Sequence, residues 1–494
     1  MRTVAVGAAT VLVALSNLGL AIAGAADLVW EVENPFRFFK RPQSFEAHQR
    51  AFLAVRGQSA ALPNNIVWRI ERRLNDPDCA DRSSPEACAD TRRAQYESSR
   101  LGWAAQTVDA VCYDRNARPR RYPAICERQY SWGKAKEDYI LPEAHTVAVR
   151  LAPERLAEAA TGLCLWSWQA RGRAGKAEIK RQPCQSPLVI PRVPFSLDRA
   201  KSGVAVKVTL PDGRELADPE VVVDDLLVVA LGDSFASGES NPDRPVVFSP
   251  TRQIVYDPNL LREEMMVSEA RPEAPPAYGL AAASGQYDPK TLPRRRMDDE
   301  ERGLMYRLTS REFQAAFDKS GAQWLSADCH RSLYGYPFRT GIQLALEDRH
   351  RSITFVSLAC SGSEATQGLF LEKDVREGFS EPNGAKTPAQ FDQLADLLCR
   401  AGTRTISASY ALPVAKAGST DIASERVTKT WCPPHARKRP IDLVLLSIGG
   451  NDVGFGALAL YGVTESASDL APIAGWVGRE IRFGPEVARA YLAV

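Results

Sequence analysis

Three residues of this sequence have types and settings that suit nucleophilic chemistry. Ser234 lies in the run Gly-Asp-Ser, Gly362 in Ala-Cys-Ser-Gly and Asn451 in Gly-Gly-Asn-Asp. A serine becomes a nucleophile when a base takes its proton, and the tetrahedral intermediate that follows needs hydrogen-bond donors aimed at its oxyanion. A serine, a glycine whose backbone N–H can approach closely, and an asparagine amide together supply the nucleophile and the donors.

Each of these residues follows a run of apolar residues that predicts a buried strand. The three runs are Leu226 to Leu231, Ser352 to Leu358 and Ile441 to Ile448, and each breaks into a loop rich in glycine or serine. Gly341 to His350 has apolar positions at helical spacing. Strands alternating with helices predict an α/β domain whose parallel sheet is covered on both faces, with the loops gathered along one edge.

A second helix is predicted from Thr387 onward. Thr387 would be its cap, Pro388 lies in the first turn, and Gln390 would complete a capping box. Its apolar face comprises Phe391, Leu394, Leu397 and Leu398.

Other readings of the same residues fail on spacing or stay open. An α/β-hydrolase elbow needs a second glycine two residues after the serine, where this chain has Ala236. A phosphate-binding loop needs a lysine after its second glycine, where Glu239 follows Gly238, and no dinucleotide fingerprint starts at either Gly232 or Gly449.

Taken singly, each of the three residues also has a structural explanation. Ser234 could be a small turn residue and Gly362 a plain turn glycine. Asn451 could cap a helix. Their common setting after buried strands favours one shared site.

The chain from about Val223 to Gly456 resembles the SGNH or GDSL hydrolases, a family of serine esterases and lipases. The Gly-Asp-Ser block, the second-block glycine and the Gly-x-Asn-Asp block stand in the family's order, and Cys329-His330-Arg331-Ser332 is similar to secreted bacterial members. The resemblance implies an SGNH-type three-layer α/β/α parallel-sheet domain that hydrolyses esters through an acyl-serine. It implies that Ser234 attacks, and that the Ser234 N–H, the Gly362 N–H and the Asn451 side chain hold the oxyanion.

The sequence lacks the general base that is expected from the resemblance to this family. It belongs to an Asp-x-x-His block after the asparagine block, and no histidine follows His435. His330 is next to a cysteine expected to be bridged, which favours a structural role, with an unusual base as the alternative. The last helical pattern, from Pro485, has no terminating signal before Val494. We therefore expect the natural protein to continue and to supply the histidine; a true absence would favour a non-catalytic envelope or carbohydrate-binding protein on a degenerate SGNH scaffold.

The first residues predict export. A charged Arg2, an apolar stretch from Thr3 to Ala23 and small residues up to Ala26 are typical of a signal peptide cleaved near Ala25. An uncleaved membrane anchor is the alternative, because the apolar stretch is nearly long enough to span. The expected location is periplasmic or extracellular.

Ten cysteines in an exported chain indicate disulfides rather than metal thiolates. Their order suggests that neighbours pair: Cys79–Cys88, Cys112–Cys126, Cys164–Cys184, Cys329–Cys360 and Cys399–Cys432. Sequence alone does not fix the connectivity.

We expect four parts in the 494 residues. Residues 1–25 form the signal peptide, 27–140 a disulfide-bearing and partly helical region, 141–223 a small immunoglobulin-like β-sandwich, and 224–494 the SGNH domain. Trp166 and Trp168, on one strand of the sandwich, are expected in its core rather than as a sugar-binding surface. An insertion at 242–322 is either a lid beside the site or a passive surface excursion.

The expected partners are small. The net charge of +2 is too small to indicate a nucleic-acid-binding protein. The sequence has no residue spacing typical of a metal site, so we expect no metal and no cofactor. The resemblance implies an ester-bearing small molecule, lipid or acylated glycan as substrate. Membrane contact is expected only through an uncleaved signal segment.

Overall fold

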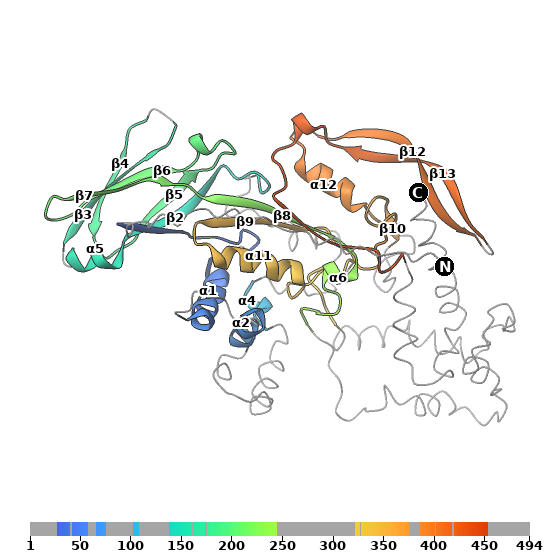
Figure 1. The fold of residues 1–494 in the computed structure, drawn as a ribbon, viewed down its shortest axis with the longest axis horizontal. Helices are drawn as coiled ribbons and strands as arrows, with labels where there is room; N and C mark the ends of the chain where they lie inside the picture. Colours follow the sequence, from blue (N-terminus) through green and yellow to red (C-terminus); the bar gives the residue numbers. More distant parts are fainter. Residues whose placement is uncertain are drawn as a thin grey trace, which may run out of the picture.

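A computed structural model describes residues 27–39, 42–57, 66–75, 102–107, 138–159, 162–172, 175–244, 322–326, 328–374, 386–400, 402–416 and 419–452. The signal segment, most of the insertion, the last helical pattern and the pairs Cys79–Cys88 and Cys112–Cys126 lie outside these residues. The described part combines α-helices with both parallel and antiparallel sheets (Figure 1).

The three predicted strands form one parallel sheet in the order β14-β8-β9. β8 (Asp224–Gly232) is central, with β9 (Arg351–Ser357) on one side and β14 (Leu443–Ser447) on the other. The register pairs Gly232 with Ser447, so the carboxyl ends of β8 and β14 are level. The loops that follow these strands therefore leave the sheet at one edge, as the apolar runs predict.

Helices cover both faces of this sheet. Successive side chains along β8 point to opposite faces, so each face contributes apolar side chains to a core under a helix. Val228 and Ala230 belong to the core under α11 (Tyr336–Glu347), and Leu227, Val229 and Leu231 to the core under α12 (Gln390–Leu398). Figure 1 shows α12 and α11 on opposite sides of β8. The expected apolar face of α12 is confirmed: Leu394 and Leu398 are buried, and Phe391 and Leu397 are partly buried against the same core.

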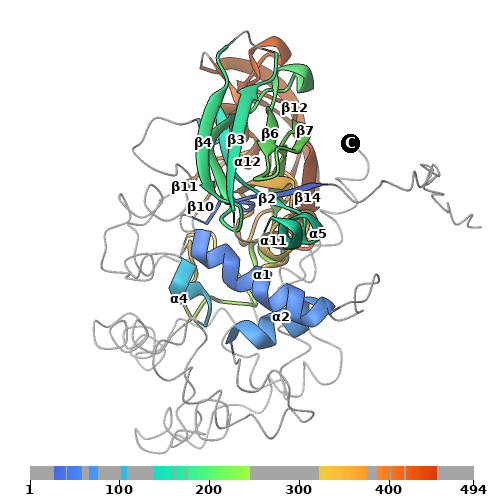
Figure 2. The ribbon, with the colours of Figure 1, turned by 90° about the vertical axis from the view of Figure 1, so that its left-hand side faces the viewer.

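Helices from the amino-terminal region add a further layer beneath α11. α1 (Pro42–Arg56), α2 (Ile66–Asn75) and α4 (Ala104–Thr107) lie together on that side (Figure 2). Phe36 and Phe39 are fully buried in the core below the sheet, and Trp103 joins them. The amino-terminal region thus contributes directly to the hydrophobic core of the parallel-sheet domain.

A β-sandwich precedes the parallel sheet. One layer has the order β4-β3-β6-β7 and the other β1-β2-β5, and both face one core that includes Trp166, fully buried, with Trp168 partly buried against it. The strands are β1 (Leu28–Val32), β2 (Ala144–Leu151), β3 (Leu163–Ala170), β4 (Glu178–Pro183), β5 (Leu188–Pro194), β6 (Val204–Thr209) and β7 (Glu215–Val221). The core placement expected for the two tryptophans is confirmed.

Two sandwich strands were not predicted. β1 comes from the region expected to be a separate helical segment, yet it pairs antiparallel with β2. β5 contains Pro191 and ends at Pro194, and prolines in a short run argue against a strand. β5 lies at an edge of its layer, where a missing backbone donor is tolerated.

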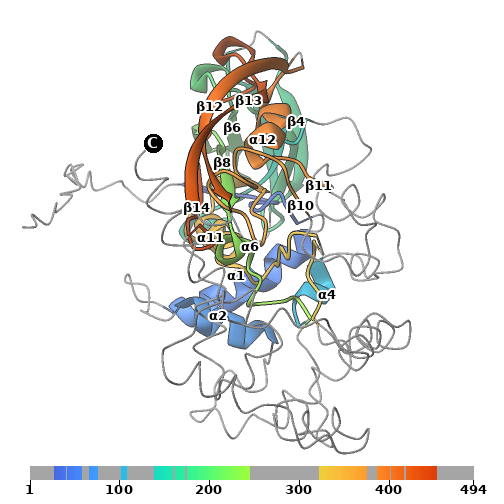
Figure 3. The same cartoon turned by 90° about the vertical axis from the view of Figure 1, so that its right-hand side faces the viewer.

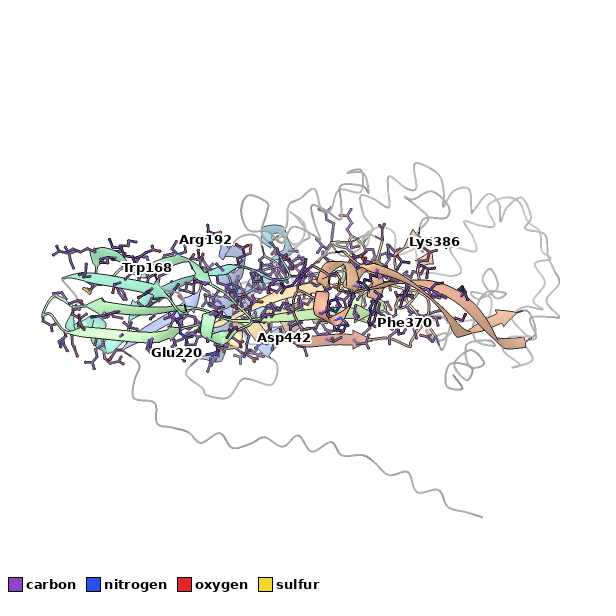
Figure 4. The ribbon with its side chains drawn as sticks, turned by 90° about the horizontal axis from the view of Figure 1, so that it is seen from above. Trp168, Arg192, Glu220, Phe370, Lys386 and Asp442 are labelled. Atoms are coloured by element: carbon purple, nitrogen blue, oxygen red, sulfur yellow. A yellow bond between two sulfur atoms is a disulfide. The ribbon has the colours of Figure 1, made fainter. Side chains whose placement is uncertain are left out.

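Three of the expected disulfides are present: Cys164–Cys184, Cys329–Cys360 and Cys399–Cys432. The last one ties the end of α12 to the end of a long antiparallel hairpin formed by β12 (Arg404–Lys416) and β13 (Ser419–Trp431). This hairpin passes over α12 and extends beyond the sheet (Figures 1 and 3). From above, Trp168, Arg192 and Glu220 lie in the sandwich at one end, and Phe370 lies near the hairpin (Figure 4).

No helix within the described ranges has the length and apolar character needed to cross a membrane.

Candidate active site

The turn after β8 depends on a glycine. Gly232 has φ +130°, and a Cβ placed on it would lie 1.9 Å from the carbonyl oxygen of Ser447 in β14. Any larger residue would push the two strands apart. Asp233 then caps the short helix α6 (Ser234–Ser237), since its carboxylate accepts a hydrogen bond from the Phe235 N–H at 3.1 Å. Ser234 therefore stands at the first position of a helix immediately beyond the central strand.

Backbone hydrogen bonds join the turn that carries Ser234 to the loops on both sides. The Asp233 N–H donates to Ser447 O at 2.8 Å, which links the turn to the end of β14. The Cys360 N–H donates to Gly232 O at 3.0 Å, which links it to the loop after β9. The three loops that the sequence singled out thus meet at one edge of the sheet (Figure 3).

The second and third motif loops also contact each other. Gly362 has φ +73°, the left-handed region that favours glycine. The Asn451 Nδ2 donates to Ser363 O at 2.8 Å. The next residue, Asp452, accepts from the Ala365 N–H at 3.0 and 3.1 Å, so both residues of this motif hold the loop that carries Gly362.

The pKa of the Asp452 carboxyl is raised at this edge of the sheet. Burial raises its pKa, and the negative charge of Asp233 raises it further, against the Ala365 N–H, which lowers it. The carboxylates of Asp233 and Asp452 are therefore close enough to interact electrostatically. Asp452 accepts from the Ala365 N–H, and Asp233 accepts from the Phe235 N–H and from Ser447 Oγ, so both carboxylates position loops.

Gln390 binds two of these loops, and the predicted capping box is wrong. α12 begins at Gln390 itself after Ala389, without a side-chain cap, and Thr387 lies in the short strand β11 (Lys386–Thr387). The fully buried Gln390 amide instead accepts from Gly232 N at 2.8 Å, donates to Gly232 O at 2.8 Å and donates to Ser363 Oγ at 3.1 Å. Gln390, which the sequence pattern placed in a capping box, therefore makes buried contacts to two loops instead.

Glu239 is a second residue whose contacts were not predicted from sequence. Its N–H donates to Ser234 O at 3.1 Å. Its carboxylate lies 2.9 Å from His330 Nδ1 and accepts from Ser361 Oγ at 2.6 Å. Its carbonyl oxygen accepts from Trp324 Nε1 at 2.9 Å. The only sequence signal was its place in the Ser-Gly-Glu run that follows the serine.

His330 is held in this cluster rather than presented to solvent. Its side chain is buried, and its ring stacks on Trp324 with centroids 3.8 Å apart. The adjacent Cys329 is bridged to Cys360, as expected. This surrounding supports the structural role for His330.

An aromatic pair lies beside the serine. Phe235 is 69% exposed although it follows Ser234 directly, and its ring lies 5.4 Å from that of Tyr336 at the start of α11. Burial raises the pKa of Tyr336, and the charge of Asp233 raises it further. The turn thus presents an exposed apolar side chain next to Ser234.

The ends of the insertion are joined near this edge. Arg244 and Gln323 exchange two backbone hydrogen bonds of 3.0 and 2.9 Å. The chain leaves and re-enters the described structure at one point. Within the described residues, no group of three or more metal-ligating side chains is found.

The chain matches no family model, no curated protein and no solved structure. The functional assignment therefore depends on the geometry of the site itself.

Proposed function

We propose that this protein is an exported serine hydrolase that cleaves carboxylic esters through an acyl-enzyme on Ser234, on an SGNH-type three-layer domain. The observation that carries the proposal is the meeting of the three motif loops at the carboxyl edge of one parallel sheet, joined by the bonds from Asp233 to Ser447 and from Cys360 to Gly232. Open α/β sheets bind and transform ligands at this edge.

The proposed roles follow from the chemistry of each group. Ser234 attacks the ester carbonyl from the start of α6. The Ser234 and Gly362 N–H groups and the Asn451 amide donate to the oxyanion, and such donors supply a large part of the stabilisation of acyl-transfer transition states. We assign no general base among the described residues, because His330 is stacked on Trp324 and faces Glu239. In the family that the chain resembles, the base follows the asparagine block.

Export is supported by two features. Three disulfides occur within the described residues, and disulfides persist in oxidising compartments. The amino-terminal sequence has the pattern of a signal peptide.

The test is ester hydrolysis by the purified full-length protein. We expect turnover of p-nitrophenyl esters by the wild type and its loss in Ser234→Ala, with Ser240→Ala as the matched control, because Ser240 is exposed and lies in the same loop. Hydrolysis that survives in Ser234→Ala would contradict the proposed nucleophile. Glycan binding without hydrolysis would favour the non-catalytic alternative.

A further inference from the structure

The nucleophile turn ends in a carboxylate that reaches two other segments. Glu239 belongs to the turn, because its N–H donates to Ser234 O at 3.1 Å. Its two carboxylate oxygens point away from the turn, one to Ser361 and one to His330. We propose that Glu239 is a positioning residue that fixes the loop carrying Gly362 against the turn carrying Ser234. This inference rests on the proposed function, because it concerns the alignment of that oxyanion site.

The first link acts directly on the oxyanion loop. Ser361 Oγ donates to Glu239 Oε2 at 2.6 Å, the short distance typical of a hydroxyl bonded to a carboxylate. Ser361 immediately precedes Gly362, and its carbonyl oxygen accepts from the Lys373 ammonium group. The residue before the proposed donor is thus held through its side chain and its carbonyl, and the peptide between it and Gly362 carries the donor N–H.

The second link orients the carboxylate. An ionised carboxylate only accepts hydrogen bonds, so His330 Nδ1 donates to Glu239 Oε1 at 2.9 Å. The imidazole is fixed by its stack on Trp324, whose Nε1 donates to Glu239 O at 2.9 Å. The histidine and the tryptophan therefore hold both the side chain and the main chain of Glu239.

Other contacts join the same loops on a different side. The Cys360–Gly232 backbone bond and the Gln390 amide act before Ser234, where β8 ends. The Cys329–Cys360 disulfide joins the His330 segment to the oxyanion loop but does not touch the nucleophile turn. After Ser234, the Ser332 N–H donates to Ser237 O at 2.9 Å, and Glu239 adds a direct side-chain bond to the oxyanion loop, so the turn is held on both sides of Ser234.

The expected consequence of losing this link is a change in turnover rather than in substrate binding. Displacing a reacting group by about 1 Å costs about 100-fold in rate. In Glu239→Ala we expect kcat to fall about 10- to 100-fold with KM changed less than about three-fold. Glu239→Gln keeps an acceptor for His330 and gains a donor that the Ser361 hydroxyl can accept, so most of the turnover should return.

The test uses four variants of the full-length protein and one control. Ser361→Ala removes only the first link. The double variant Glu239→Ala with Ser361→Ala should be no slower than Glu239→Ala alone, because the bond between the two residues is already absent in that single variant. Glu178→Gln is the matched control, since Glu178 is exposed in β4 of the sandwich. Unchanged kcat in both Glu239→Ala and Ser361→Ala, or fully multiplicative effects of the two, would overturn the proposal.

A second readout separates this proposal from the proposed function. Hydrogen exchange of peptides covering residues 359–363 should be faster in Glu239→Ala and in Ser361→Ala, and unchanged in Glu178→Gln. A wild-type protein that hydrolyses no ester would end the proposed function, and faster exchange would then still establish the link. Unchanged exchange in both variants would overturn the link even in an active enzyme. If Glu239→Ala fails to fold, Ser361→Ala gives the same two readouts.

Discussion

Among the described residues, the Asn451 side chain donates one hydrogen bond, and its amide carries a second N–H. The Nδ2 atom donates to Ser363 O at 2.8 Å. One N–H therefore fixes the side chain against the Gly362 loop, and the other can serve the oxyanion. The same bond that positions the amide thus couples two of the three proposed donors.

Replacing Asn451 by alanine should remove both contributions. We expect kcat/KM for ester hydrolysis to fall. The loss should correspond to about 3 kcal/mol of transition-state stabilisation, the scale seen for single oxyanion donors. Steady-state kinetics of Asn451→Ala against wild type measure this loss. An unchanged turnover would remove Asn451 from the oxyanion role.

The exposed side chain of Phe235 leads us to expect a preference among ester substrates. The side chain is 69% exposed next to Ser234, and its ring lies tilted against that of Tyr336 with centroids 5.4 Å apart. We expect it to contact the apolar part of a substrate, so Phe235→Ala should weaken kcat/KM for long-chain or aryl esters by about 1 to 2 kcal/mol and leave acetate esters nearly unaffected. Equal losses across a chain-length series would argue against this contact. Leu163→Ala, exposed on the sandwich, is the control.

Among single residues, sequence predicted that Ser234, Gly362 and Asn451 lie in loops at one edge of the sheet, but it did not predict the side chains that hold those loops together. Ser234, Gly362 and Asn451 were found because each follows a buried apolar run. Gln390 and Glu239 were missed, because a long-range contact to a loop leaves no local pattern. Gln390 even carried a misleading one, since glutamine near a helix start is typical of a capping box.

Among the elements, α12 contacts the site through the side chain of its first residue, Gln390. The amide of this residue bonds the N–H and the carbonyl oxygen of Gly232, where β8 ends and the loop that carries Ser234 begins. β8, β9 and β14 were predictable because continuous apolar runs bounded by small residues are typical of buried parallel strands. β5, with its prolines, and β1, far away in sequence, were not, since pairing partners decide such strands.

Gln390→Leu should be strongly destabilising. The change keeps the approximate size but leaves the Gly232 N–H and C=O without the Gln390 partner in a buried setting, at a cost of about 2 to 4 kcal/mol. Thermal unfolding should show a clear fall in the transition temperature. Gln393→Leu is the matched control on the same helix, where the side chain makes an exposed bond to Pro388 O, and we expect a change within about 0.5 kcal/mol. Equal effects of the two would refute the buried-link account.

Across the whole molecule, a buried ionic cluster joins the sandwich to the parallel sheet. Asp225 of β8 lies 2.6 Å from Arg439 Nη1 and accepts from Thr354 Oγ1 of β9 at 3.0 Å. His145 of β2 brings its Nε2 to 3.4 Å from the same carboxylate, and Phe195 packs against its ring. Breaking such a buried network costs about 3 to 5 kcal/mol, so the two parts are expected to unfold together.

Two buried histidines should make stability depend on pH. Burial lowers the pKa of His145 to about 4, with Asp225 opposing and Arg37 and Arg439 adding to the shift, and burial lowers the pKa of His48 to about 4. Both are neutral in the folded protein. Their contribution to stability is therefore complete above pH of about 6.5, the unfolded pKa, and is lost as pH falls toward about 4.

The expected loss is about 1.4 kcal/mol per pH unit for each histidine within this window. Thermal unfolding at pH 7 and pH 5 measures it for the wild type, His48→Gln and His145→Gln. Each variant should lose less stability than the wild type between the two pH values. Parallel pH dependence in all three proteins would show that neither histidine is the titrating group.

The most direct test of the account is to map a covalent active-site label on the full-length protein. A fluorophosphonate reacts with an activated serine, and mass spectrometry of the digested adduct locates it. We expect a single adduct on Ser234, absent in Ser234→Ala and slower to form in Asn451→Ala. An adduct on another serine, or a folded full-length protein that does not react, would contradict the assignment of Ser234 as the nucleophile.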